Sequence, residues 1–191
     1  IRMPEKDKYG HWTNWSMTAL PWMSIGYETQ IPPISTVTFY NAIANDGIMM
    51  RPRFVKSVMK DGKVIAEFPP EKVMERRIAK PQTIKTMQTI LEHVVSQGLG
   101  RKAGSRMFKV AGKTGTAQQT QTRPSHALFV CFAPYQNPEI AIATRIPFGY
   151  SSDYAAQVTR DIVKYYYGLA EEDDIVTGTA NTPDAGITNE W

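Results

Sequence analysis

Apolar side chains recur every three or four residues in three segments of the chain. This spacing predicts amphipathic helices over residues 35–46, 81–97 and 153–167. Each range is directly followed by a glycine, a residue that commonly ends a helix. These three segments account for the helical part of the expected fold.

The caps and the buried faces of these helices follow from their residues. We expect Ser35 or Thr36 to cap the first helix, Pro81 to open the second, and Ser151 or Ser152 to cap the third. The side chains expected to face the core are, in chain order, Val37, Tyr40, Ile43, Ala44, Ile84, Met87, Ile90, Leu91, Val94, Val95, Val158, Ile162, Tyr165 and Tyr166.

Short runs rich in β-branched and aromatic residues predict the strands. Residues 52–67 should form a hairpin, because their central Asp-Gly dipeptide readily adopts the positive φ angles of a tight turn. Three more strands are expected at 107–112, 126–133 and 139–147. The last two are joined by a short turn, so they should pair antiparallel.

The two ends of the chain show neither the spacing of an amphipathic helix nor the pattern of a strand. Residues 1–30 are expected to be irregular, and residues 170–191, which are acidic and polar, are expected to be disordered. The elements between them predict an α/β mixture of the α+β type, in which helices flank an antiparallel sheet.

Composition narrows the class of protein without identifying it. The 191 residues are 42% hydrophobic and 21% charged, which is typical of a globular domain, and no apolar run is long enough to cross a membrane. The formal net charge of +4 is small and scattered, so no nucleic-acid partner is expected. A single cysteine, Cys131, excludes an internal disulfide or a multi-cysteine zinc site.

The sequence Lys-Thr-Gly-Thr at 113–116 is the strongest candidate for chemistry. Glycines at 112 and 115 flank the lysine, and we expect them to leave the strand edge open to the backbone of a ligand. One ammonium group and two hydroxyls suit an extended peptide that bears a carboxylate. The four residues alone are equally consistent with a strand that runs out into a turn.

Longer segments around this motif resemble the penicillin-binding proteins. Residues 110–118, VAGKTGTAQ, are similar to the third active-site motif of that family. Residues 24–28, 33–34 and 39–47 are similar to the segment between the second and third motifs of the family. Residues 126–129, 132–135 and 137–138 resemble the strand and turn after the third motif in class B enzymes of the cell-elongation type. The resemblance covers roughly residues 1–169. It implies the C-terminal portion of a transpeptidase domain, with a penicillin-binding and serine β-lactamase-like fold that is incomplete in this chain.

The resemblance implies roles for the motif residues. Lys113 is expected to supply positive potential and support proton movement, and Thr116 to give its backbone N–H to an oxyanion hole, so these two are the expected catalytic residues. The expected substrate-binding residues are Thr114, Gly115, Thr116, Ala117 and Gln118. The family implies no metal and no organic cofactor.

Two motifs of the family have no credible counterpart in this sequence. In the family, a Ser-x-x-Lys motif that holds the nucleophile and a Ser-x-Asn motif both precede Lys-Thr-Gly. Ser57 and Lys60 match Ser-x-x-Lys by letter, but they lie in the expected hairpin, whereas the family's nucleophile opens a buried helix. We interpret Ser57 as a chance match. The nucleophile is expected outside this sequence, and the chain alone is expected to be inactive.

The implied function is that of a peptidoglycan D,D-transpeptidase acylated by β-lactams. A serine β-lactamase or carboxypeptidase of the same fold, and a sensor or scaffold that binds β-lactams without turnover, remain alternatives. The expected partners are peptidoglycan stem peptides, β-lactam antibiotics, the remainder of the transpeptidase domain and a membrane-bound cell-wall synthesis complex. The expected location is the extracytoplasmic face of the cell membrane.

Five other residues have a structural and a functional interpretation. We interpret His126 as a strand-end residue with satisfied hydrogen bonds, with substrate placement as the alternative. His11 is taken as a loop residue, with an edge-of-site or metal-binding role as the alternative, and His93 as solvated. Cys131 is expected to be packed in the core, and Arg123 to lie on a surface loop or contact a stem peptide.

Overall fold

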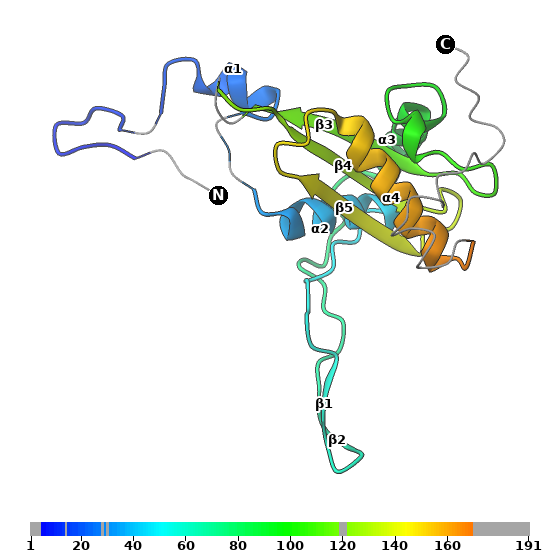
Figure 1. The fold of residues 1–191 in the computed structure, drawn as a ribbon. Helices are drawn as coiled ribbons and strands as arrows, with labels where there is room; N and C mark the ends of the chain where they lie inside the picture. The colour runs from blue at the N-terminus through cyan, green and yellow to red at the C-terminus, as the bar shows by residue number, and fades with distance from the viewer. Residues whose placement is uncertain (1–4, 14, 28, 30, 119–121, 170–191) are drawn as a thin grey trace. The chain divides into compact units, whose positions relative to one another are not determined.

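The computed structural model describes residues 5–13, 15–27, 29, 31–118 and 122–169 (Figure 1). It divides the chain into two compact units, Ile1–Pro32 and Pro33–Trp191. The expected tail at 170–191 lies outside the described residues. Within the described residues, no helix is both long and apolar enough to span a bilayer.

The first unit is irregular over most of its described length, as the sequence predicts. It also holds one short helix, α1 (Ala19–Ser24), which the residue pattern does not predict. Six residues make fewer than two turns, and such a helix is too short to show a 3.6-residue period.

The second unit is built on a three-stranded antiparallel sheet. The strands β3 (Ala111–Ala117), β4 (His126–Ala133) and β5 (Ile140–Ile146) lie in that order, with β4 in the middle. The antiparallel pairing of β4 with β5 confirms the prediction for these strands. The sheet presents two open edges among the described residues, one on β3 and one on β5.

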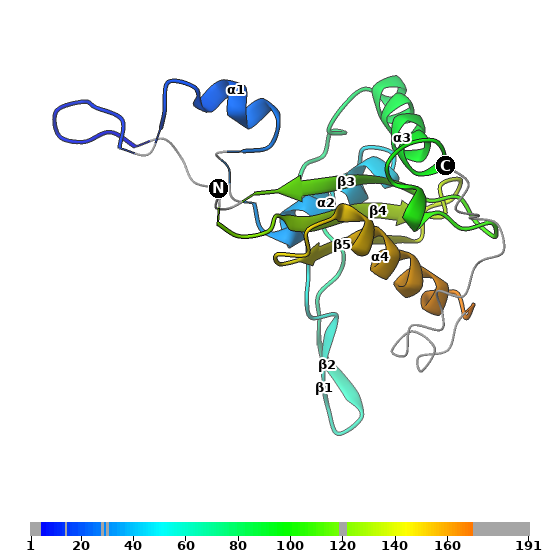
Figure 2. The ribbon, with the colours of Figure 1, turned by 45° about the horizontal axis from the view of Figure 1, so that its top comes forward.

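Helices cover both faces of this sheet (Figures 1 and 2). α4 (Ser152–Tyr166) packs on the face that carries Phe129 and Cys131. α2 (Pro33–Ala44) packs on the opposite face, beside Phe132. Side chains of successive strand residues point to opposite faces, so β4 supplies both cores. The predicted α+β class, with helices flanking an antiparallel sheet, is confirmed.

α3 (Pro81–Ser96) packs beside β3 and is followed by a short 3-10 helix, η1 (Arg101–Ala103). Pro81 occupies the first turn of α3, as predicted, and Ser151 caps α4 by accepting a hydrogen bond from the backbone N–H of Asp153. These start signals are local, which explains why the sequence alone reveals them.

A two-stranded hairpin separates α2 from α3. It consists of β1 (Ser57–Lys60) and β2 (Lys63–Glu67), and all residues of β2 are exposed. Asp61 and Gly62 form the turn with φ angles of +50° and +74°. The predicted hairpin and its turn are therefore confirmed.

Two predicted boundaries are wrong. α2 begins at Pro33, so Ser35 and Thr36 lie inside its first turn and do not cap it; proline is favoured at that first position because it has no N–H to leave unpaired. β3 begins at Ala111, which pairs with Phe132, whereas the sequence places a strand at 107–112. The Lys-Thr-Gly-Thr motif is therefore the strand itself and not the turn after it.

The predicted buried face of α4 is also wrong. Its four expected core residues, Val158, Ile162, Tyr165 and Tyr166, are 40–53% exposed. The side chains that face the sheet instead include Ala155, Ala156, Thr159 and Val163.

Candidate active site

The motif occupies β3, which lies at an edge of the sheet. Among the residues that the structure describes, β4 is the single strand paired with β3, so the other edge of β3 has no strand partner, although α3 packs beside its start. An open strand edge offers unpaired N–H and C=O groups that can bind an extended ligand. The geometry therefore suits the peptide binding that the sequence suggests.

The side chain of Lys113 contacts the backbone of β3. Its ammonium group, which is exposed, donates to the carbonyl of Thr114 at 2.7 Å. In an antiparallel strand the N–H and C=O of alternate residues point to the same side, so the N–H of Thr116 lies on the same side of β3 as this carbonyl. The Thr116 N–H therefore lies on the side of the strand that the Lys113 ammonium group contacts.

The motif's side chains differ in exposure. Thr116 and Gln118 are exposed, whereas Gly115 and Ala117 are half-buried. Thr114 is 8% exposed, because it lies opposite Phe129 on the face that α4 covers. Of the two threonine hydroxyls, that of Thr116 is the more accessible to a ligand.

The glycines of the motif make room for β4. A Cβ at Gly112 would lie 2.7 Å from the carbonyl oxygen of Val130, closer than real Cβ atoms approach oxygen. A Cβ at Gly115 would lie 3.1 Å from the Cβ of Leu128. The missing side chain of Gly112 therefore allows close packing against β4, a role that the sequence does not indicate. Its part in opening the strand edge to a ligand stays a prediction.

His126, the first residue of β4, is paired with Ala117, which directly follows the Lys-Thr-Gly-Thr motif on β3. It is 7% exposed, and its Nδ1 accepts a hydrogen bond from the N–H of Phe148 at 3.1 Å. Its ring lies 4.8 Å from the ring of Phe148, and its Nε2 is 3.4 Å from Arg145. These contacts support the interpretation of His126 as a strand-end residue with satisfied hydrogen bonds.

The structure supports the structural interpretation of three other candidates, Ser57, His93 and His11. Ser57 lies in β1, where residues three apart point to opposite faces, so Ser57 and Lys60 do not share one turn of a helix. The His93 side chain is exposed and contacts Glu92, and that of His11 is exposed and contacts Asp7.

Cys131 is fully buried, and burial raises the pKa of its thiol to about 12, so the thiol is protonated and packed. Arg123 is exposed and lies over the ring of Phe148 at 5.1 Å. The described residues hold no group of three metal-ligating side chains.

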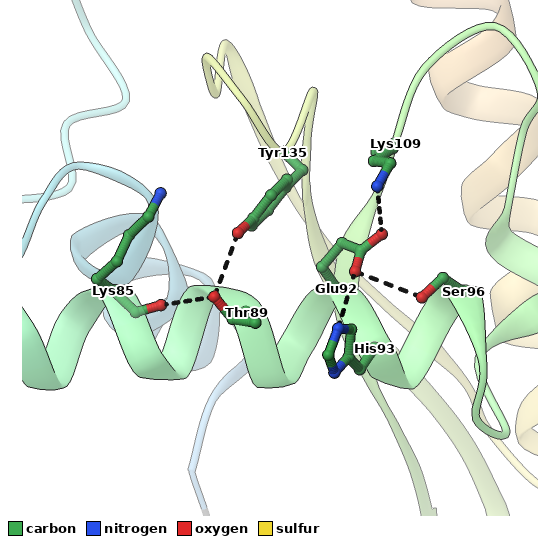
Figure 3. Close-up of polar contacts among 7 residues, drawn as sticks. All are labelled: Lys85, Thr89, Glu92, His93, Ser96, Lys109 and Tyr135. Carbon is green, nitrogen blue, oxygen red and sulfur yellow. Dashed lines mark hydrogen bonds and ion pairs between the residues drawn. The ribbon is translucent and has the colours of Figure 1, made fainter.

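One polar cluster has no counterpart in the sequence interpretation. Glu92, on α3, is buried and contacts the ammonium group of Lys109, two residues before β3 (Figure 3). A glutamate in a helix with an apolar face is normally read as solvated, because charged residues are rarely buried unless paired. The partner lies far along the chain, so the sequence offers no signal for this contact.

Comparison with known proteins places these observations in a family. Residues 5–164 match the family described as the penicillin binding protein transpeptidase domain. The chain is 36% identical, over 138 residues, to the peptidoglycan D,D-transpeptidase PbpA of Mycolicibacterium smegmatis, a match that covers 69% of this chain and 27% of that protein. It is 28% identical over 172 residues to penicillin-binding protein 2A of Bacillus subtilis, covering 79% of this chain and 24% of that protein.

Solved structures give the same result. Penicillin-binding protein A from M. tuberculosis, solved as an imipenem acyl-enzyme complex, aligns with a TM-score of 0.71 and 28% identity, over 80% of this chain and 34% of that one. The transpeptidase domain of penicillin-binding protein 3 from Burkholderia pseudomallei aligns with a TM-score of 0.62 and 28% identity, over 91% and 50%. The chain thus spans about a quarter of the curated relatives named above and between a third and a half of these solved chains. This chain belongs to the penicillin-binding protein transpeptidase domain family.

Proposed function

We propose that this chain forms the Lys-Thr-Gly side of the active site of a peptidoglycan D,D-transpeptidase that β-lactams acylate. The observation that carries the proposal is the position of the motif on an edge strand, inside a family match that spans residues 5–164. On that strand the Thr116 N–H lies on the side that the Lys113 ammonium group contacts. In this proposal residues 1–169 are the C-terminal portion of the transpeptidase domain, and the serine nucleophile belongs to another part of that domain.

The proposed reaction has two steps. The serine oxygen attacks the carbonyl carbon before the terminal D-alanine of a stem peptide, the C–N bond breaks, and D-alanine leaves with the serine proton. An amine of a neighbouring stem peptide then attacks the ester, forms the crosslink and returns a proton to the serine. A β-lactam takes the place of the first substrate and leaves an acyl-enzyme that hydrolyses slowly.

The motif residues have separate roles in this reaction. The N–H of Thr116 donates to the oxyanion that forms at the attacked carbonyl, and its exposed hydroxyl donates to the substrate carboxylate. The ammonium group of Lys113 attracts that carboxylate and supports proton transfer at the serine. Thr114, Gly115 and Ala117 belong to the strand along which the acyl chain lies, and Gln118 directly follows that strand. The reaction uses no metal and no organic cofactor.

The proposed setting follows from the reaction. Peptidoglycan lies outside the cytoplasmic membrane, so the active site faces the extracytoplasmic side, and the protein acts with a membrane-bound cell-wall synthesis complex. The name of the PbpA relative, which states a D,D-transpeptidase activity, and the acyl-enzyme formed by imipenem in one solved neighbour support the proposed reaction.

Two substitutions at Thr116 test the proposal in the complete protein. Thr116→Val keeps the N–H and removes the hydroxyl, and should cost about 1–2 kcal/mol, mostly in the capture of carboxylate-bearing substrates. Thr116→Pro removes the N–H itself and should lower the acylation rate constant roughly 10²–10³-fold, with strand distortion adding to the loss. Stopped-flow acylation by one fluorescent penicillin measures both.

The controls separate the alternatives. Ser57→Ala should leave acylation unchanged, because Ser57 lies in the hairpin and not at the site. The isolated 191-residue chain should form no covalent adduct detectable by mass spectrometry. Equal losses for the valine and proline variants, with both folded, would remove the oxyanion role from Thr116. Fast release of the bound penicillin would instead indicate a β-lactamase, and slow release without crosslinking of stem peptides would indicate a sensor.

A further inference from the structure

α3 carries a row of polar side chains that reaches two separate parts of the sheet (Figure 3). Lys85, Thr89 and Glu92 follow one another at intervals of four and three residues, which places them on one face of the helix. Glu92 contacts Lys109 in the segment that leads into β3. Thr89 and Lys85 contact Tyr135 in the turn between β4 and β5.

The carboxylate of Glu92 is held from several directions. Its side chain is 8% exposed, and Oε1 lies 3.2 Å from Nζ of Lys109. Oε2 accepts from the hydroxyl of Ser96 at 3.4 Å and lies 3.7 Å from Nε2 of His93. A buried carboxylate must keep such partners, because an uncompensated buried charge is strongly destabilising. The position of Lys109 is therefore coupled to the position of α3.

Tyr135 contacts both α3 and the backbone of Lys109. The Thr89 hydroxyl donates to the carbonyl of Lys85 at 3.1 Å, so in the 3.3 Å contact with Thr89 the hydroxyl of Tyr135 is the donor. The ammonium group of Lys85 lies 5.5 Å from the ring centroid of Tyr135. The backbone N–H of Tyr135 donates to the carbonyl of Lys109 at 2.8 Å. Lys109 is thus held by its side chain and by its backbone.

The two residues after Lys109 also pack on α3. Val110 and Val95 belong to one buried cluster, and Ala111 and Leu91 belong to the other. The three consecutive residues 109–111, which lead into β3, are therefore tied to α3 by an ion pair and by two shared apolar clusters. From Ala111 the strand continues through Lys113 to Thr116 with no loop between them.

We propose that Glu92 and Lys109 are positioning residues for the active site: their ion pair, with Tyr135, fixes the start of β3 and thereby the Thr116 N–H. This inference rests on the proposed function. Neither residue touches substrate. Their effect is transmitted along four to seven residues of extended strand, and a misplacement of about 1 Å at a reacting centre can cost about 100-fold in rate.

The test separates binding from chemistry in the complete protein. Acylation by one fluorescent penicillin is followed over a range of concentrations, which yields a dissociation constant for the non-covalent complex and an acylation rate constant. Glu92→Gln and Lys109→Met should each lower the rate constant about tenfold and change the dissociation constant less than about twofold, because oxyanion stabilisation acts in the transition state. The double variant should be no slower than the slower single variant.

Two variants provide matched controls. Lys109→Arg keeps the cation and should retain the parent rate constant within about twofold. Glu75→Gln removes a different acid, whose 3.7 Å contact with Lys72 lies on an exposed connection, and should behave as the parent. If the Glu92 variant does not fold, Tyr135→Phe decides the question. It removes one hydroxyl from the same connection and should lower the rate constant roughly threefold, because the strand's support is weakened and not lost.

Each other outcome contradicts the inference. Folded variants that are acylated at the parent rate would overturn the positioning role and leave the proposed function intact. An arginine variant as slow as the methionine variant, or a loss confined to the dissociation constant, would also overturn it. A parent protein that no penicillin acylates would overturn the proposed function, and the positioning role with it.

Discussion

α3 and α4 both pack on the sheet and both carry a strong apolar period, yet they bury different kinds of residue. α3 buries three large apolar side chains, Ile84, Leu91 and Val95, which are 3–4% exposed. Ile90, which was also expected to face the core, is instead 48% exposed. α4 buries Ala155 and Ala156 completely and leaves Val163 1% exposed, while its other large apolar side chains are exposed. These exposed residues, which we call the outer stripe of α4, are Tyr154, Val158, Ile162, Tyr165 and Tyr166.

The difference reflects what the sheet presents to each helix. Beneath α4, β4 contributes Phe129 to a core that Ala155, Ala156 and Val163 share. The hydroxyls of Thr159 and Thr144 form a 2.6 Å hydrogen bond across the interface. A hydrophobic period thus locates an apolar stripe, but packing decides which face of the helix the sheet covers.

The largest effect is expected at a buried residue of α3. Leu91→Ala should lower the free energy of unfolding by about 2–5 kcal/mol, because it leaves a cavity between α3 and β3. Ile90→Ala, at the adjacent position that is 48% exposed, is the matched control and should cost much less. Urea unfolding followed by circular dichroism measures both, and similar losses for the two variants would show that the apolar period does not mark the contact face of α3.

A smaller effect is expected where α4 meets the sheet. Ala156→Leu should destabilise the fold by about 1–3 kcal/mol, because it inserts a large side chain where Ala156 is fully buried. Val158→Leu adds one methylene on the outer stripe and serves as the control. A neutral Ala156→Leu would mean that the α4 interface has space for a large residue, and the contrast with α3 would lose its physical basis.

Local signals account for the parts of the fold that the sequence predicts. The Asp61-Gly62 turn, Pro81 at the start of α3 and the Ser151 cap of α4 all depend on residues close in the chain. The errors depend on distant contacts. The start of β3 is set by its pairing with β4, and the buried face of α4 is set by the side chains beneath it.

The contact that ties the end of α4 to the sheet should have a modest effect. The hydroxyl of Tyr167 lies 3.3 Å from Oε2 of Glu139 and 3.4 Å from the carbonyl oxygen of Ala133. Tyr167→Phe should cost about 0.5–1.5 kcal/mol. Phe108, whose ring lies 5.4 Å from that of Tyr167, keeps its packing in this variant.

The same contact predicts a pH dependence at high pH. Desolvation, followed by the charge of Glu139, raises the pKa of Tyr167 to about 12 from 10.0. The folded state therefore keeps a proton that the unfolded state loses first, so this stabilisation is complete below pH 10 and is lost as the pH rises through 12. The difference between parent and Tyr167→Phe in urea unfolding should shrink over that range, and a constant difference would contradict the assignment.

The candidate site shows the same division between local and distant information. The resemblance of the motif to the family can be read from nine residues, because family motifs are local, whereas its place inside β3 cannot. The ion pair of Glu92 with Lys109 and the role of Gly112 in strand packing depend on residues far along the chain, and no pattern near them indicates either.

The smallest effect is expected on the outer stripe of α4. Tyr165→Gln replaces a side chain that is 48% exposed, and the free energy of unfolding of this chain should change by less than about 0.5 kcal/mol. Tyrosine and glutamine also differ little in helix propensity, so the helix itself is not perturbed. Urea unfolding beside the Leu91→Ala variant gives the decisive contrast. A loss of stability in Tyr165→Gln that approaches the loss in Leu91→Ala would mean that the outer stripe of α4 is buried in the folded chain, as the apolar face of α3 is. The contrast between the two helices would then be contradicted.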